Sequence, residues 1–238
     1  MLSNIQFHYS GPVLPAIFKK RINRFVALVE LKGQEVFAHI KNTGRMRELL
    51  IPGEICWLEK AKNPNRKTNY DLIAIRSQNT IVNLDSLLPN FIVGRILEEG
   101  LLPDLNQRKC IIPERMTDHS RLDFLVEMAA MDLYIEVKGV NLVTSDGLAL
   151  FPDAVTARGT RHLEKLMELR RAGNRAAIVF IVQRSDARTL KAHRDLDPVF
   201  AETLERARQI GVEVYAFTLE VEPGRVNICR EITVEFTA

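Results

Sequence analysis

Residues 120–140 read SRLDFLVEMAAMDLYIEVKGV, and this stretch decides the fold of the C-terminal part of the chain. The segments around Asp123 and Glu136 predict two strands, and their closeness in sequence favours an antiparallel hairpin. Alternate side chains of a strand share a face, so Glu136 and Lys138 project together while Val137 points to the other side. The two carboxylates can hold a divalent cation such as Mg²⁺, and the nearby ammonium group can offset charge on a phosphate.

The register of this hairpin decides whether the two acids lie on one face. A two-residue loop at Ala130-Met131 places Asp123 opposite Lys138 and diagonal to Glu136, within reach of a bridging cation. A loop of three residues turns Asp123 away from Glu136 unless a bulge restores the alignment. The same spacing also fits an exposed strand with an ordinary cross-strand ion pair, so the hairpin alone leaves both interpretations open.

Length and composition are those of a globular protein. The chain has 238 residues, 46% hydrophobic and 26% charged, which suffices for two moderate cores, and we expect two domains. The three cysteines are far apart and lack C-x-x-C spacing, which argues against a disulfide framework or zinc site and fits a reducing cytoplasm. No apolar run approaches the ~20 residues that span a bilayer, and the N-terminus lacks a signal-peptide pattern. We therefore expect a cytoplasmic protein without membrane association.

Positive charge is concentrated in the N-terminal third. Residues 1–85 carry 13 Lys and Arg against 7 Asp and Glu, although the net charge of the whole chain is only +3. Such clusters can follow a phosphate backbone, but they also fit a solvated surface. The candidate nucleic-acid-binding residues here are Lys19, Lys20, Arg21, Arg24, Lys41, Arg45 and Arg47, and a further cluster comprises Lys60, Lys62, Arg66 and Lys67.

Residues 1–85 predict a small β domain. Short apolar-rich segments at 25–31, 35–40, 55–58, 71–75 and 80–84 are separated by turn residues. Five short strands favour a five-stranded barrel of the OB type, a fold that often presents a basic nucleic-acid-binding surface. The aromatic residues of this region fit either base stacking or the core, and their spacing favours the core for most of them; they are Phe18, Phe25, Phe37 and Trp57.

Residues 86–238 predict a mixed α/β domain with helices packed on a central sheet. Helices are expected over 90–100, 156–172 and 197–210, with Thr156 as the N-cap of the second and glycines at their ends. Strands are expected at both arms of the hairpin, at 176–182 and at 212–219. The continuous apolar run 176–182 is typical of a strand buried on both faces. The stretch through Pro103 and Pro113 is expected to be irregular.

The second helix carries a further candidate site. Arg158, Arg161 and His162 lie at i, i+3 and i+4 and therefore share a helix face. Arginine forks and an imidazole can grip a phosphate, which makes these three residues candidates for nucleic-acid binding. The alternative is a surface face paired with acids of the same region. Asp153, just before the helix, fits a cap as well as a ligand.

Several sequence blocks resemble the sugar fermentation stimulation protein (SfsA) family of bacteria and archaea. In order along the chain they read NTGRMRELLIPG, VNLDSLLPN, SRLDFLV, YIEVKGVNL and FPDAVTARGTRHLEKL. The resemblance covers nearly the whole chain. It implies an OB-like N-terminal domain joined to a domain similar to the PD-(D/E)XK nucleases. It also implies DNA binding without strong sequence preference and a link to sugar catabolism, maltose in particular.

The resemblance also assigns roles to single residues. Asp123 takes the place of the first acid of the nuclease motif, and Glu136 and Lys138 take the places of its ExK pair, so these three are the candidate catalytic residues. The Asp123 and Glu136 carboxylates and the backbone carbonyl of Val137 would hold Mg²⁺ or Mn²⁺. The motif departs from the family pattern at Leu122, where a proline usually precedes the acid. A further ligand from the preceding helix would be Glu98 or Glu99, although both also fit solvated helix positions.

Two functions are compatible with this sequence. The protein is expected to bind DNA, double-stranded in the first instance, as a regulatory factor with a nuclease-like metal site. The alternative is a nuclease dependent on Mg²⁺ or Mn²⁺ that hydrolyses phosphodiester bonds. No recognition helix or base-reading motif stands out, so the sequence predicts no base preference.

Overall fold

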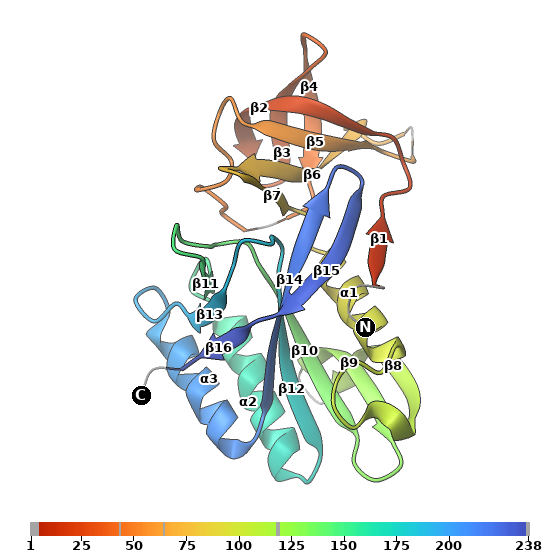
Figure 1. Ribbon diagram of the computed structural model, residues 1–238, viewed down its shortest axis with the longest axis vertical. Helices are drawn as coiled ribbons and strands as arrows, with labels where there is room; N and C mark the ends of the chain where they lie inside the picture. Colours follow the sequence, from red (N-terminus) through yellow and green to blue (C-terminus); the bar gives the residue numbers. More distant parts are fainter. Residues whose placement is uncertain (1–4, 43, 64, 118–119, 237–238) are drawn as a thin grey trace.

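A β-barrel built from the first third of the chain lies on a larger α/β part, as Figure 1 shows. The computed structural model describes residues 5–42, 44–63, 65–117 and 120–236. None of the helices within these ranges is both long and apolar enough to cross a membrane.

The barrel closes because its first and last strands in the ring pair with each other. In the described part of the chain the strand order is β4-β3-β2-β5-β6-β7, and an additional β4–β6 pairing closes a ring of five strands, β2 to β6. The predicted five-stranded OB-like barrel is confirmed. The strands are β2 (Val13–Asn23), β3 (Val26–Leu31), β4 (Gln34–Ile40), β5 (Ile55–Lys60), β6 (Tyr70–Ser77) and β7 (Thr80–Asn83).

The membership of the ring differs from the expectation in one respect. Strand β2 was not expected, and the last expected segment is β7, which pairs with β6 outside the closed ring. Strand β2 escapes a simple alternation pattern because Pro15 lies within it and two register shifts interrupt its pairing with β3. Phe18 and Trp57 are buried, whereas Phe25 and Phe37 are exposed, so the core prediction holds for two of the four aromatic residues.

The α/β part is organised around one mixed sheet. Within the described residues its strand order is β1-β15-β14-β12-β10-β9-β8, with β10, β12 and β14 parallel to one another. The strands are β1 (Gln6–His8), β8 (Arg108–Thr117), β9 (Ser120–Met128), β10 (Leu133–Val140), β12 (Arg175–Val182), β14 (Glu213–Glu222) and β15 (Arg225–Glu231). A small parallel sheet contains β11 (Leu148–Phe151), β13 (Thr189–Ala192) and β16 (Thr233–Glu235).

Two features of this sheet depart from the sequence analysis. The stretch through Pro113 is a strand, β8, because its backbone pairs with β9 on the edge of the sheet, where a proline is tolerated. Strand β1 comes from the N-terminal end of the chain, yet it pairs with β15 of the α/β part. The chain therefore crosses between the two parts before it enters the barrel.

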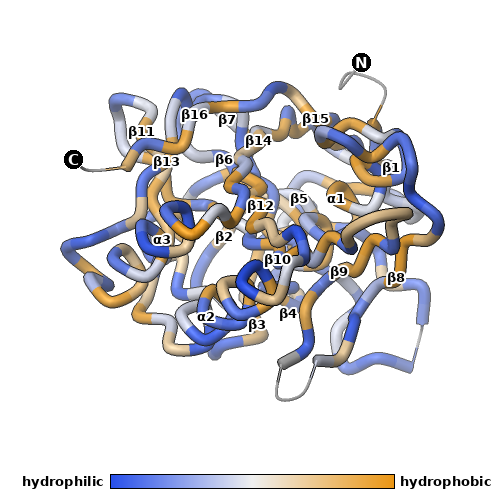
Figure 2. Tube along the Cα trace, turned by 90° about the horizontal axis from the view of Figure 1, so that it is seen from below, coloured by the Kyte–Doolittle hydropathy of each residue, from blue (hydrophilic) through white to orange (hydrophobic). Residues whose placement is uncertain are grey.

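Helices cover both faces of the central sheet. They are α1 (Leu88–Glu98), α2 (Ala157–Arg171) and α3 (Pro198–Ile210), and a short 3₁₀ helix covers Leu105–Gln107. Alternate residues of β12 enter two different cores, with Ala177 and Val179 packed toward α1 and Ile178 and Phe180 packed toward α2 and α3. Figure 2 shows the resulting apolar centre at β12 and the hydrophilic outer turns of α2. The expected strand buried on both faces is confirmed.

The starts of α2 and α3 are tied together by one acid. Thr156 caps α2 by accepting from the Gly159 N–H at 3.1 Å, as predicted. Asp197 caps α3 by accepting from the Phe200 N–H at 3.0 Å, and its second oxygen accepts from the Thr156 N–H at 2.8 Å. The helix starts are therefore held at a fixed position relative to each other and to the loop before α2.

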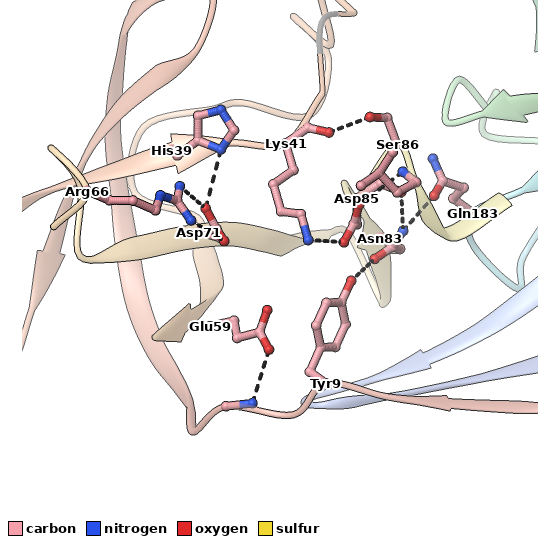
Figure 3. A network of polar contacts seen from close by, with 12 residues as sticks. Tyr9, His39, Lys41, Glu59, Arg66, Asp71, Asn83, Asp85, Ser86 and Gln183 are labelled. Carbon is pink, nitrogen blue, oxygen red and sulfur yellow. Dashed lines mark hydrogen bonds and ion pairs between the residues drawn. The ribbon is translucent and has the colours of Figure 1, made fainter. Parts of the chain in front are cut away.

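The barrel is fixed to the α/β part by apolar and polar contacts. Trp57 and Ile73 of the barrel join the apolar cluster that contains α1. Beside them, the buried Asn83 at the end of β7 donates through Nδ2 to Gln183 Oε1, and the Asn83 carbonyl accepts from Asn141 Nδ2 at 2.7 Å. Figure 3 shows Tyr9 and Gln183 converging on Asn83. Because Gln183 and Asn141 directly follow β12 and β10, the barrel is anchored at the ends of these strands.

Candidate metal and nucleic-acid site

The hairpin of β9 and β10 brings the two predicted acids together. The strands pair with Leu133 opposite Val126 and Ile135 opposite Phe124, and the connection spans residues 129–132 because Asp132 Oδ1 accepts from the Met128 N–H at 3.0 Å. The predicted two-residue loop is therefore wrong, and the register is shifted by two residues. Continued by one residue beyond the last observed pair, this register places Asp123 opposite Glu136 instead of Lys138, and the two acids are close enough for the charge of Glu136 to act on Asp123.

Asp123 lies where the two strands stop pairing. Its Oδ2 accepts from the Val137 N–H at 2.7 Å, and its Oδ1 accepts from Asn90 Nδ2 of α1, also at 2.7 Å. Burial raises the pKa of Asp123, and the nearby charge of Glu136 raises it further, against the effect of the two hydrogen bonds. A carboxylate with a raised pKa beside a second acid is typical of a site that binds a cation.

Glu136 is buried, with 3% of its surface exposed, and its two oxygens have different surroundings. Oε1 accepts from Lys138 Nζ and from His162 Nδ1. Oε2 is also buried, and no residue in the described part of the chain bonds to it. Burial opposes ionisation of Glu136, but the bond from His162 and the charge of Lys138 outweigh it, so the pKa of this carboxyl lies below its ordinary value.

The unpartnered Oε2 atom tests whether a metal suits this site. A buried carboxylate oxygen without a partner is costly in a folded protein unless a ligand supplies the missing interaction. Among the described residues, no group of three or more His, Cys, Asp and Glu side chains is arranged to hold a metal. Mg²⁺ commonly binds through one or two carboxylates and retains several waters, so Asp123, Glu136 and a carbonyl such as that of Val137 fit a hydrated divalent cation.

Val137 and Lys138, next to Glu136 in β10, line a cleft between the barrel and the α/β part. The cleft has a volume of about 710 Å³, and these two residues belong to its α/β wall. Its barrel wall includes Arg24 and Arg45, whose side chains are exposed. The two walls approach each other closely at one side, since a Cβ atom added to Gly44 would lie 2.8 Å from Asp153 Oδ2. Exposed arginines of the barrel therefore line the same cleft as Lys138 of the α/β part.

The predicted basic residues of the barrel have different environments. Arg21 lines the cleft, but its guanidinium donates to the carbonyls of Arg24, Gly44 and Arg45 at 2.7 to 2.8 Å. It therefore holds the loop that carries Arg45. Lys19 pairs with Glu30, Lys41 pairs with the buried Asp85 as Figure 3 shows, and Lys20 and Arg47 are exposed outside the cleft lining.

The predicted helix face of α2 divides between two environments. Arg158 and Arg161 are exposed, whereas His162 is buried and faces the sheet. The His162 ring bonds to Glu136 through Nδ1, and its Nε2 accepts from Arg158 Nε at 3.4 Å. Asp153 lies in the loop that lines the cleft, since Thr156 provides the cap. His162 thus contacts Glu136 directly, and Arg158 extends this contact toward the surface.

Helix α1 contributes a residue that sequence reasoning missed. Asn90, in its first turn, reaches Asp123. Glu98 and Glu99, the acids proposed from this helix, lie at its other end and pair with Arg95 at 2.5 and 3.0 Å. The only sequence signal for Asn90 was its position in the block VNLDSLLPN, and nothing in the local pattern indicated a contact with Asp123.

Comparison with known proteins identifies the family of this chain. Residues 20–84 match the model of the SfsA N-terminal OB domain, and residues 87–225 match that of the sugar fermentation stimulation protein RE domain. Homologues of sugar fermentation stimulation protein from Carboxydothermus hydrogenoformans and Moorella thermoacetica are each 40% identical, over 93% and 94% of this chain and 96% and 97% of their own.

A solved structure agrees along almost the full length. The SfsA of Pyrococcus furiosus, solved in complex with Ca²⁺, is 35% identical and superposes with a TM-score of 0.86 over 97% of this chain and 98% of its own. The expected architecture, an OB-like barrel followed by a mixed α/β domain, is confirmed. The chain belongs to the sugar fermentation stimulation protein family.

Proposed function

We propose that this protein binds DNA in the cleft between its two parts, with the phosphodiester backbone next to a divalent cation. The observation that carries the proposal is the buried Glu136, whose Oε2 has no partner among the described residues and whose neighbours Val137 and Lys138 line the same cleft as Arg24 and Arg45. A cation site facing exposed guanidinium groups suits a polyanion, because each of its phosphates can bind an arginine or the metal.

The cation would be Mg²⁺ or Mn²⁺, held by Asp123, Glu136 and the Val137 carbonyl. The Ca²⁺ bound to the Pyrococcus furiosus relative supports a divalent ion for this family. Such an ion, when bound, supplies positive charge to a phosphate oxygen and lowers the pKa of a coordinated water. Lys138 and His162 keep Glu136 ionised through their bonds to Oε1, which leaves Oε2 for the ion.

The proposed DNA contacts predict little base preference. Arginine contacts with phosphates position a duplex without reading its sequence. We propose a cytoplasmic regulatory role of this kind in sugar catabolism, consistent with the name of the family, in which the protein binds duplex DNA of many sequences. Binding of this type weakens with salt, by about 0.9 units of log affinity per phosphate for each unit of log salt.

A metal-dependent nuclease is the second candidate. The observation that favours it is Lys138, which borders the cleft and is bonded to Glu136 beside Asp123. In this role Lys138 Nζ would donate to a phosphate oxygen as negative charge develops there.

One experiment separates the two candidates. Purified protein is incubated with plasmid, linear duplex, single-stranded DNA and RNA, with Mg²⁺, Mn²⁺ or a chelator, alongside Glu136→Ala and a control, Glu164→Ala, at an exposed position of α2. Retarded but intact DNA in every lane supports the binding protein. Metal-dependent products that disappear with Glu136→Ala, but persist with Glu164→Ala, support the nuclease. If the protein neither retards nor cleaves any DNA, that result contradicts both candidates.

A further inference from the structure

The outer face of β3 and β4, together with the adjoining β2–β3 turn, carries two aromatic side chains that the barrel core does not use, Phe37 on β4 and Phe25 in the turn. Phe37 is 55% exposed and Phe25 is 47% exposed, whereas Phe18 and Trp57 are 1% and 6% exposed. Exposure of large aromatic rings loses the free energy that burial would provide. The two buried rings show that the barrel can accommodate aromatic residues in its core, so the exposed pair calls for a separate explanation.

The strand register places these rings on one continuous surface. Leu28 pairs with Phe37 and Val26 pairs with His39, and residues paired in this way share a face. The ring of Phe25 lies nearly parallel to that of His39, with 14° between the planes and 6.5 Å between the centroids. Figure 3 shows the His39 ring beside Asp71, with its Nδ1 3.3 Å from Asp71 Oδ1 but without a hydrogen bond, while Arg66 pairs with the same carboxylate.

The charges around this surface favour a polyanion. Lys20 is exposed and pairs with Leu28 across the strands, and the Arg24 guanidinium lies 5.7 Å from the centre of the Phe25 ring. Of the acids nearby, Glu30 pairs with Lys19 at 2.6 Å and Asp71 pairs with Arg66, whereas Glu35, exposed on the same face of β4 as Phe37, has no ion pair within the described residues. Exposed rings between unpaired cations are the arrangement by which proteins stack bases and bind the phosphates that join them.

Arg24 connects this surface to the cleft. The same residue that lies over Phe25 also lines the cleft that Lys138 borders. A strand whose bases stack on Phe37 and Phe25 would therefore pass Arg24 as it enters the cleft. Bases in a duplex are stacked on each other and cannot present their faces to these rings, so the surface suits unpaired bases only.

We infer that the outer face of β3 and β4, with Phe25, Phe37 and His39, binds a single-stranded nucleic-acid segment by stacking and guides it into the cleft. This inference rests on the proposed function and specifies its substrate as nucleic acid with an unpaired stretch. Duplex binding through Arg24 and Arg45 does not require the two rings, so the two claims separate experimentally.

The test compares the affinity of labelled oligo(dT), oligo(U) and an oligo(dT)·oligo(dA) duplex for the full-length protein and for Phe37→Ala and Phe25→Ala. We expect each substitution to weaken single-strand binding about tenfold, because one lost stacking contact costs about 1.4 kcal/mol. The duplex affinity should stay within about twofold of that of the wild type. Met131→Ala is the control, because Met131 is also exposed and lies in the β9–β10 loop at the end of β10 that faces away from the barrel. The relative effect on oligo(dT) and oligo(U) shows whether DNA or RNA is preferred.

A second variant adds a signal that only stacking produces. Phe37→Trp should restore single-strand binding, and its added fluorescence should be quenched by oligo(dT) but not by the duplex. Three results would overturn the inference while the cleft proposal stands. They are an unchanged single-strand affinity in both alanine variants, a loss of duplex affinity as large as the loss of single-strand affinity, and a change in oligomeric state with Phe37→Ala. Failure of the wild type to bind any nucleic acid would overturn both.

Discussion

The two walls of the cleft differ in how their charged groups are held. On the α/β wall, Glu136 and His162 are buried and Asp123 accepts two hydrogen bonds from fixed donors. On the barrel wall, Arg24 and Arg45 are exposed, and within the described residues neither has an acidic partner. A fixed set of oxygens suits a small ion with strict geometry, whereas exposed guanidinium groups suit a flexible polymer. This difference supports the proposal that metal is bound on the α/β side and nucleic acid on the barrel side.

The largest effect outside the acid pair is expected for His162, which tests whether the α/β wall depends on its fixed geometry. His162→Ala removes the bond to Glu136 Oε1 and should weaken Mn²⁺ binding about 10- to 100-fold, as loss of a residue that orients a metal ligand commonly does. Calorimetric titration measures this affinity. His162→Gln, which retains a donor, should recover part of it, and an unchanged affinity in His162→Ala would show that Glu136 needs no support from α2.

The arginines of the barrel wall should affect DNA and leave the metal untouched. Arg24→Ala combined with Arg45→Ala should weaken duplex binding about tenfold or more at physiological salt and lower the slope of log affinity against log salt by about 2. Arg171→Ala with Arg188→Ala removes the same charge from exposed positions outside the cleft lining and serves as the control. Equal losses in the two double variants would mean that overall charge, and not the cleft, determines binding.

Arg21 should act on stability, unlike its neighbours. Its guanidinium donates to the backbone carbonyls of Gly44 and Arg45 in one loop and to that of Arg24 in the β2–β3 turn. Arg21→Ala should therefore lower the free energy of unfolding by about 1–2 kcal/mol, the range expected for charged hydrogen bonds that are partly exposed. Denaturant unfolding measures this change. A loss of DNA affinity without a loss of stability would place Arg21 among the phosphate-binding residues instead.

The smallest predicted effect concerns Asp123 in the absence of metal. The pKa of Asp123 is raised in the folded protein, so the protonated side chain favours folding. This contribution to the free energy of unfolding is fully present only below the ordinary pKa of about 3.9, and it is lost as the pH rises through the pKa of the folded state. Asp123→Asn should therefore raise the Tm at neutral pH with a chelator, by less than about 4 °C, the shift of 1 kcal/mol in a protein of this size. The gain should vanish near pH 3, and a Tm lowered at pH 7 would contradict the assigned direction.

Part of this architecture follows from local sequence patterns. The apolar run of β12 and the caps at Thr156 and Asp197 are local features, and their elements begin and end close to the predicted positions. Strand β2 was missed because Pro15 and its bulges interrupt the alternation on which strand prediction depends. Strand β1 was missed because its partner, β15, lies at the far end of the chain.

The site shows the same limit at the level of side chains. Strand alternation predicts the set of Asp123, Glu136 and Lys138. The hairpin that sets their register includes a hydrogen bond from the Met128 N–H to the Asp132 side chain, which no periodicity reveals. Helical spacing indicated that His162 shares a face with Arg158, but not that His162 faces the sheet. Asn90 reaches Asp123 only because α1 packs beside the β9–β10 hairpin, which is a tertiary contact.

The most direct test of the account is a calorimetric titration of Mn²⁺, with Ca²⁺ in parallel, into the wild type, Glu136→Gln and the surface control Glu164→Gln. The account predicts that the wild type and Glu164→Gln bind the ion with equal affinity, that bound ion raises their Tm, and that Glu136→Gln folds but binds none. Binding of Mn²⁺ by Glu136→Gln with the affinity of the wild type would contradict the assignment of Glu136 Oε2 as a metal ligand.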